Sequence, residues 1–193
     1  MVLRDEIISR VQASVAVKER IVSQLALLES IEKVVDAIVS AYQNNKKVLL
    51  AGNGGSAADA QHIAAEFSGR FYFDRPPLPA EALHVNTSFL TAVANDYSYE
   101  EVYARMLKAV GEKGDVFIGI STSGNSGNII KAMETARQKG MFIVAFTGES
   151  GGKMKDCCDC LLNIPSNDTP RIQEAHITVG HIICEFVENR LFG

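Results

Sequence analysis

Apolar side chains recur at two different spacings along the chain, and each spacing predicts a different kind of element. In the first forty-odd residues they fall three and four positions apart, as in Leu25, Leu28, Ile31, Val35, Ile38 and Tyr42. This spacing is typical of amphipathic helices. We therefore expect residues 1–45 to form a helical segment that packs on a domain face or on another subunit.

From residue 46 onward the pattern changes to short, continuous apolar runs separated by helical stretches. The expected strands are residues 46–51, 81–85, 115–120, 141–147 and 160–164. Continuous apolar runs that alternate with helices are typical of a parallel sheet covered on both faces. The pattern predicts an α/β fold with a flavodoxin-like, doubly wound sheet. We expect one domain over residues 1–193, with its α/β core at 46–193.

Glycine-rich or polar loops follow three of the expected strands at their carboxyl ends, the edge where open parallel sheets bind ligands. They read GNGGS from Gly52, STSGNS from Ser121 and GESGG from Gly148. The Ser121 loop offers four hydroxyls and opens a helix over about residues 127–139, whose positive N-terminal end favours an anion.

These residue types are also common in turns and helix caps, so one such loop alone indicates little. Two loops at one edge favour a shared pocket. Neither a Walker motif nor a complete dinucleotide fingerprint is present, and a small sugar phosphate therefore fits better than a nucleotide.

Two pairs of side chains suited to metal binding lie on expected helices. His62 and Glu66 are four residues apart after the first loop, and Gln173 and His181 are eight residues apart on the last helix. Each pair shares one helical face, so the four groups could bind a divalent metal ion with positions open for substrate. A surface pair and a core histidine explain the same spacings, and His176 could also approach the site.

Composition argues against several other classes of function. The formal net charge of -4 gives no basic field for nucleic acid or for an anionic membrane. The sequence contains no run of eighteen apolar residues, so it predicts no membrane span, and the first ten residues lack a signal-peptide pattern. The four cysteines lack the spacing of a disulfide framework, so we expect reduced thiols in a cytoplasmic protein. We interpret the CCDC cluster as packing, because it lacks the second cysteine pair of a zinc site.

Four separated motifs resemble the phosphoheptose isomerases of the sugar isomerase (SIS) fold, and the resemblance extends over nearly the whole chain. They are GNGGS with DAQHIAAEFSGR, AND at 94–96, GDVFIGISTSGNSGNIIKAM, and RIQEAHITVGH. Members of this family convert sedoheptulose 7-phosphate to D-glycero-D-manno-heptose 7-phosphate, the first step toward activated heptose for bacterial surface polysaccharide. The resemblance implies a homotetramer with sites at subunit boundaries, in which the N-terminal helices serve oligomerisation.

The resemblance also implies a role for each matching residue. It implies a metal ion, zinc, held by His62, Glu66, Gln173 and His181. It implies phosphate binding by Ser121, Thr122, Ser123 and Ser126, with Ser56 nearby. It implies contacts to the sugar hydroxyls from Asn53, Gly54, Gly55, Asn95, Asp96, Glu66 and Gln173.

The reaction implied by the family is an aldose–ketose exchange through an enediol. We assign Glu66 as the base that removes a proton from carbon and His181 as the acid/base partner. The metal ion either polarises the substrate oxygens or orders the site, and the sequence does not decide between these. Arg70 lies in a matching motif, but its role is left open.

Two non-catalytic functions share this fold. One is an adaptor that binds a bacterial replication initiator, and the other is a sugar-phosphate sensor. The adaptor branch departs from the isomerases at the positions of Glu66 and His181, and it has arginine at the position of Ser123. This chain retains the isomerase residue at all three positions. We therefore predict an isomerase.

Overall fold

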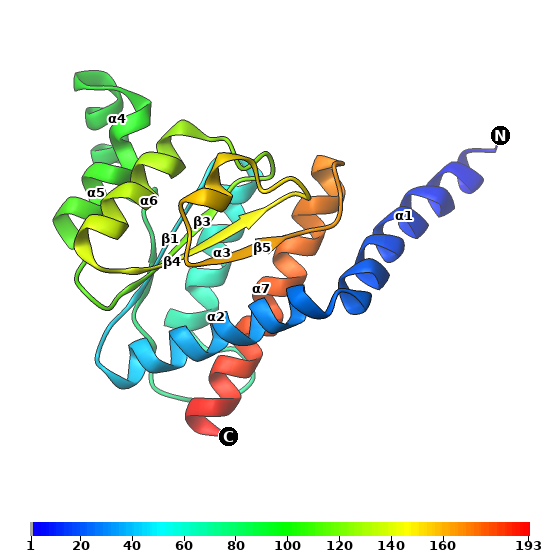
Figure 1. Ribbon diagram of the computed structural model, residues 1–193, viewed down its shortest axis with the longest axis horizontal. Helices are drawn as coiled ribbons and strands as arrows, with labels where there is room; N and C mark the ends of the chain where they lie inside the picture. The colour runs from blue at the N-terminus through cyan, green and yellow to red at the C-terminus, as the bar shows by residue number, and fades with distance from the viewer. Residues whose placement is uncertain (1) are drawn as a thin grey trace.

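A five-stranded parallel sheet forms the centre of the computed structural model, which describes residues 2–193 (Figure 1). The strand order is β2-β1-β3-β4-β5, which is the predicted flavodoxin-like order. The strands are β1 (Val48–Gly52), β2 (Ala80–Ala82), β3 (Val116–Ile120), β4 (Phe142–Thr147) and β5 (Cys160–Asn163).

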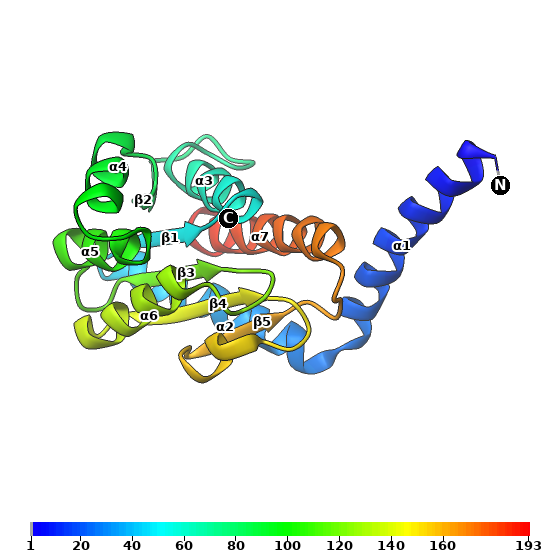
Figure 2. The ribbon, with the colours of Figure 1, turned by 90° about the horizontal axis from the view of Figure 1, so that it is seen from above.

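Helices connect the strands and cover both faces of the sheet. They are α1 (Leu3–Ser23), α2 (Leu25–Gln43), α3 (Gly55–Ser68), α4 (Thr87–Asp96), α5 (Val102–Val110), α6 (Gly127–Lys139) and α7 (Thr169–Phe192). Alternate strand residues point to opposite faces, so Leu50 and Ile118 pack toward α2, α3 and α7, whereas Leu49 and Phe117 pack toward α5 and α6. In Figure 2, α3 and α7 run beside each other.

The carboxyl ends of the strands meet at one edge of the sheet. Gly52 at the end of β1 pairs with Ile120 at the end of β3, and Ile120 pairs with Phe146 of β4. The chain forms β2 on one side of β1 and then returns to form β3 on the other side, so the strand order reverses between β1 and β3. Doubly wound sheets bind ligands at this position. The loops after β1 and β3 both begin there.

Most predicted elements are confirmed, and α6 occupies the predicted residues 127–139. The prediction of a strand at 81–85 was wrong at its end, because β2 stops at Ala82. β2 is an edge strand that pairs with β1 alone, and after it the chain turns toward Asn86, the N-cap of α4. Leu83 is nevertheless fully buried beneath the α5 side of the sheet. Its N–H still donates to the Leu50 carbonyl oxygen of β1 at 2.9 Å, so hydrogen bonding to β1 extends one residue beyond β2.

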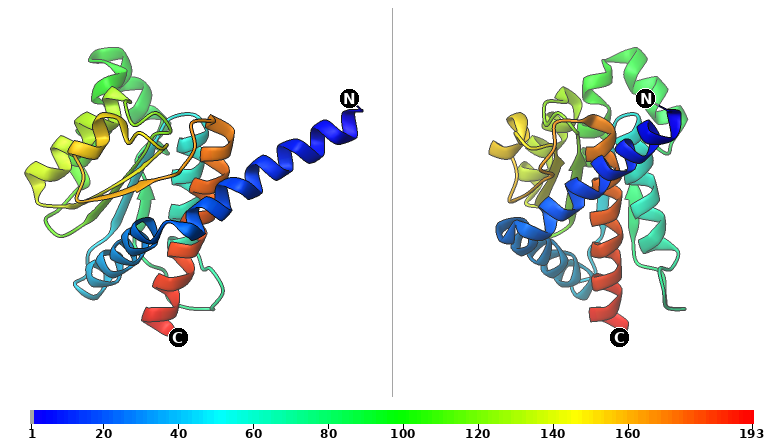
Figure 3. Two further views of the ribbon diagram at one scale, coloured as in Figure 1. Left: turned by 45° about the vertical axis from the view of Figure 1, so that its right-hand side comes forward. Right: turned by 90° about the vertical axis from the view of Figure 1, so that its right-hand side faces the viewer.

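The first helix projects from the body of the molecule (Figures 1 and 3). Val17 and Ile21 in its second half are buried, where α1 packs on α2 and α7. The part of α1 before Val17 exposes a series of large apolar side chains, namely Leu3, Ile7, Ile8, Val11 and Val15. Within residues 2–193, no helix combines the length and the apolar character needed to cross a membrane.

All four cysteines are free thiols, as predicted. Cys160 and Cys184 are buried, and Cys157 and Cys158 are half-buried. Burial raises the pKa of the Cys158 thiol to about 11, with a smaller contribution from neighbouring acidic groups. The Cys158 thiol is therefore protonated at neutral pH.

Candidate active site

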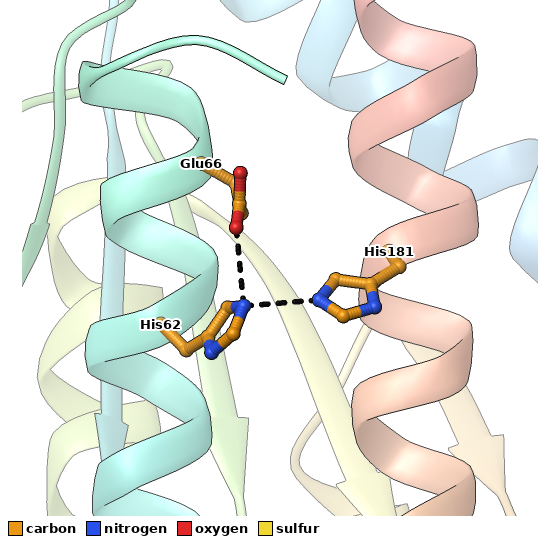
Figure 4. Close-up of side chains that lie close together, drawn as sticks. All are labelled: His62, Glu66 and His181. Carbon is orange, nitrogen blue, oxygen red and sulfur yellow. Dashed lines mark hydrogen bonds and ion pairs between the residues drawn. The ribbon is translucent and has the colours of Figure 1, made fainter. Parts of the chain in front are cut away.

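Helices α3 and α7 bring three potential metal ligands together (Figure 4). On α3, the Nε2 atom of His62 lies 3.1 Å from Oε1 of Glu66. The same nitrogen lies 3.0 Å from Nε2 of His181 on α7. One ligand atom from each of the three residues lies within 4.8 Å of the others. Two imidazole nitrogens and a carboxylate oxygen at these separations suit a divalent metal ion.

A glycine lets α3 and α7 approach each other beside the three potential metal ligands. A Cβ atom at Gly180 would lie 2.6 Å from Cδ1 of Ile63, closer than non-bonded carbon atoms can approach. Gly180 and Ile63 are the sequence neighbours of His181 and His62. A larger side chain at position 180 would push α7 away from α3, so this glycine helps to set the distance between the two imidazoles.

Gln173 and His176 lie on the same helix but in different environments. The Gln173 amide covers Gly55 at the beginning of α3, where an added Cβ would collide with the amide nitrogen. His176 is fully buried, with its Nε2 atom 3.0 Å from the Thr147 carbonyl oxygen. Burial lowers the pKa of His176 to about 4, against a small opposing effect of that hydrogen bond. His176 is therefore a core histidine outside the candidate site.

The loop after β3 brings three of its hydroxyl groups together. Ser121 Oγ lies 2.9 Å from Ser126 Oγ and 3.4 Å from Ser123 Oγ. The loop is fixed to the end of β4, because the Gly148 N–H donates to the Thr122 carbonyl at 2.9 Å. It leads directly into the N-terminus of α6, whose first N–H groups have no partner within the helix. This arrangement can bind an anion such as phosphate.

A cavity of about 300 Å³ adjoins the serine loop. It is lined by Thr122, Ser123, Glu149 and Asn167, and by the first turn of α7 at Thr169. A second hollow, of about 440 Å³, opens over α3 beside His62 and Glu66.

The loop after β1 is held by side chains from two other segments. Asn53 and Asn128 of α6 exchange two amide hydrogen bonds of 2.9 Å, and Tyr99 donates to Asn53 Oδ1 at 3.1 Å. Tyr103 donates to the Gly52 carbonyl. These bonds fix the orientation of the Asn53 amide and leave its second Nδ2 hydrogen free to donate. No local sequence pattern predicts Tyr99 or Asn128 as site residues, because their contacts with Asn53 are tertiary.

The remaining predicted residues are more dispersed. Asn95 and Asp96 are exposed at the end of α4, and Asn95 donates to Asp96 at 2.9 Å. Among the hydrogen bonds of the described chain, neither side chain bonds to the His62, Glu66 and His181 cluster or to the loop after β3. Helix α4 stands apart from α7 in Figure 1. Gly54 is exposed and has a φ of 57°, whereas Ser56 is buried. Arg70 is exposed just beyond α3.

Asp59 is an acidic group close to the predicted ligands. It lies on α3 one turn before His62 and is half-buried, with a buried Oδ2 that has no hydrogen-bond partner among the described residues. Burial raises the pKa of Asp59 to about 6, although the nearby His62 lowers it. The α3 surface beside the ligands therefore carries a second carboxyl group.

Comparison with known proteins identifies the family. The SIS domain model matches residues 11–148. The chain is 57% identical to a phosphoheptose isomerase from Aneurinibacillus thermoaerophilus, over 98% of this chain and 96% of that protein. The chain belongs to the phosphoheptose isomerase family.

Solved structures agree with this assignment to the phosphoheptose isomerase family. The phosphoheptose isomerase of Neisseria gonorrhoeae has a TM-score of 0.91 at 39% identity and covers 97% of this chain and 99% of its own. That of Francisella tularensis has a TM-score of 0.93 at 35% identity, over 98% of this chain and 100% of its own. The predicted SIS fold and isomerase class are confirmed, and neither the adaptor nor the sensor is favoured.

Proposed function

We propose that this protein converts sedoheptulose 7-phosphate to D-glycero-D-manno-heptose 7-phosphate. The observation that carries the proposal is the His62, Glu66 and His181 cluster in a chain that belongs to the phosphoheptose isomerase family. The product is the first intermediate toward activated heptose for bacterial surface polysaccharide.

The ligand cluster supports a metal ion, which we take to be zinc. His62, Glu66 and His181, with Gln173 as a fourth ligand, would hold it, and bound zinc would supply Lewis-acid polarisation of substrate oxygens. The donor set fits, because two imidazoles, a carboxylate and an amide oxygen leave room for substrate.

Glu66 and His181 carry the proton transfers. Glu66 takes a proton from the first carbon of the open-chain ketose, and an enediol forms as the carbonyl oxygen at the second carbon gains a proton. His181 transfers protons between the two oxygens, so that the first oxygen loses its proton as the aldehyde forms and the second carbon is reprotonated. The exchange is balanced without a redox cofactor. The Glu66 side chain is 26% exposed, which leaves it accessible to substrate.

The loops at the sheet edge support binding of the rest of the substrate. The phosphate would bind the hydroxyls of Ser121, Thr122, Ser123 and Ser126 at the N-terminus of α6. The sugar hydroxyls would bind Asn53, Gly54, Gly55, Asn95, Asp96, Glu66 and Gln173, with Ser56 next to the loop. Asn53 is already fixed as a donor by Asn128 and Tyr99.

We further propose a cytoplasmic homotetramer made of one domain per chain. Residues 1–45 would serve the assembly, and residues 46–193 would form the α/β core. The exposed apolar side chains of α1, such as Ile7 and Val11, support the assembly, because burial between subunits would remove them from water. Light scattering of the purified protein tests the tetramer directly.

The function is tested with sedoheptulose 7-phosphate in deuterated water, followed by NMR. We expect the aldose product, with deuterium entering at a reacting carbon. Both should be lost when a chelator removes the metal ion, and both should return with zinc. The Glu66→Gln variant is the matched control, because it retains the shape of the side chain without its basicity. Absence of turnover and of exchange from folded, zinc-supplied protein would contradict the proposal and favour the adaptor or sensor class.

A further inference from the structure

A buried ion pair joins α7 to the segment that follows α3. Arg75 Nε lies 2.8 Å from Glu188 Oε1, and the two side chains are 2% and 1% exposed. Burying two charges is costly unless further hydrogen bonds satisfy them, and an apolar pair of similar volume is often as stable. The remaining hydrogen bonds of each partner show what this pair connects.

The arginine binds the end of the helix that carries His62 and Glu66. Arg75 Nη2 donates to the Glu66 carbonyl oxygen at 2.9 Å, and Nη1 donates to the Phe67 carbonyl oxygen at the same distance. Longer bonds from Nη1 reach the carbonyls of Gly69 and Pro76. The last carbonyls of a helix lack partners within the helix and attract a cation. Arg75 therefore fixes the backbone of Glu66 itself.

The glutamate organises the segment that contacts the ligand on the other helix. Glu188 Oε1 accepts from the Phe71 N–H at 3.0 Å, and Oε2 accepts from the N–H groups of Tyr72 at 2.6 Å and Phe73 at 3.0 Å. The Phe71 ring lies against the His181 imidazole, with 5.8 Å between ring centroids. Glu188 follows His181 by seven residues, so both lie on one face of α7.

We propose that Arg75 and Glu188 are positioning residues that fix α3 against α7 and so set the geometry of the metal ligands. His62 and Glu66 come from one helix and His181 from the other, and a site divided between two helices depends on their separation. The inference rests on the proposed metal site. Arg75 and Glu188 act through the ligand-bearing helices and not on the substrate.

The chain contains a second buried carboxylate that serves as a matched control. Asp115 is fully buried and accepts from the N–H groups of Lys47 at 3.1 Å and Glu112 at 2.8 Å. Its Oδ2 atom also lies 2.9 Å from Lys47 Nζ. Asp115 precedes β3, at the sheet edge opposite the candidate site. Replacing the Asp115 carboxylate by an amide weakens buried hydrogen bonds and an ion pair comparable to those of Glu188, at a site that does not contact α3 or α7.

The test compares Glu188→Gln with Asp115→Asn in the full-length protein. Zinc binding to the metal-free protein is measured by competition with a chromophoric chelator, and circular dichroism checks that each variant is folded. We expect about ten- to a hundred-fold weaker zinc binding for Glu188→Gln, as for changes in other groups that orient metal ligands. We also expect a fall in kcat with little change in KM. Asp115→Asn should lose thermal stability yet bind zinc as the unaltered protein does.

Unchanged zinc affinity in folded Glu188→Gln, or an equal loss in Asp115→Asn, would overturn the positioning role. If Glu188→Gln does not fold, Arg75→Lys replaces it, because lysine keeps the charge but cannot reach the carbonyls of Glu66 and Phe67 together. Normal zinc affinity in folded Arg75→Lys would then refute the proposal. Failure of the unaltered protein to bind zinc would instead reject the metal site on which the inference rests.

Discussion

The imidazole rings of His62 and His181 face each other from two helices, with their Nε2 atoms 3.0 Å apart. In the absence of a cation, at most one of two neutral rings can donate at this contact, and two protonated rings would repel each other. A divalent metal ion would accept the lone pairs of both nitrogens and of the Glu66 carboxylate. The relationship between the two rings therefore supports a site for a cation.

Replacement of His62 tests this site directly. We expect His62→Ala to lose high-affinity zinc binding and nearly all turnover, because one imidazole ligand is removed while α3 keeps a good helix former. Equilibrium zinc titration and the isomerase assay measure the two effects. His84→Ala is the control, since His84 lies in the turn after β2 and should leave zinc binding unchanged. Equal zinc affinity in the two variants would contradict the assignment.

Glu66 is expected to act as the base. Glu66→Gln should lower kcat by about a hundred- to ten-thousand-fold, the usual contribution of a positioned acid or base. Because Glu66 is also a proposed ligand, the zinc content of the variant is measured first. Thermal stabilisation by sedoheptulose 7-phosphate should persist if substrate still binds. Near-normal turnover would remove Glu66 from the mechanism.

How much of this site could be predicted depends on whether the geometry is local. His62 and Glu66 share a face because of helix periodicity, and α6 begins where the serine loop ends, so both follow from neighbouring residues. Arg75 and Glu188 are 113 residues apart, and no local pattern pairs them. Gly180 likewise has no local signature, because its role depends on a helix that comes more than a hundred residues earlier.

The errors have the same physical origin. The strand expected at 81–85 ends at Ala82, because the chain turns at Leu83 and His84 toward α4. Leu83 is apolar because it is buried beside α5, whereas Val85 is exposed. The sequence allows His176 as a site residue, because it lies on the same helix as His181. The structure instead places it in the core, with its Nε2 atom at the Thr147 carbonyl. The pattern of a sequence indicates which residues are buried more directly than it indicates what they contact.

The serine loop is expected to determine substrate affinity. Ser126→Ala removes the hydroxyl that lies 2.9 Å from Ser121 Oγ. We expect KM to rise by about ten-fold or more, as for the loss of one hydrogen bond to a charged group, while kcat changes little. Steady-state kinetics with sedoheptulose 7-phosphate measure both parameters, and Ser30→Ala on α2 is the control. A fall in kcat with unchanged KM would argue against phosphate binding by this loop.

Gly55 is expected to matter because it makes room for Gln173. A Cβ at Gly55 would collide with the Gln173 amide, whose flexible end can move at little cost in stability. We therefore expect Gly55→Ala to remain folded but to lose activity. Activity is compared among Gly55→Ala, Gln173→Ala and the double variant. If the glycine acts through Gln173, the double variant loses no more than Gln173→Ala does. Additive losses would show an independent role for Gly55.

His176 is expected to make folding stability depend on pH. Burial lowers its pKa from 6.5 to about 4, so the unfolded chain binds a proton between these values while the folded chain does not. Stability from this group is therefore complete above about pH 6.5 and is lost as the pH falls toward 4. The loss at pH 5 is about 2 kcal/mol in the free energy of unfolding. The free energy of unfolding is measured with urea at pH 7.5 and at pH 5, at fixed protein concentration. Its decrease between the two pH values should be larger by this amount in the unaltered protein than in His176→Gln, whose amide can still donate to Thr147. An equal pH dependence in both proteins would show that His176 is not held neutral by burial.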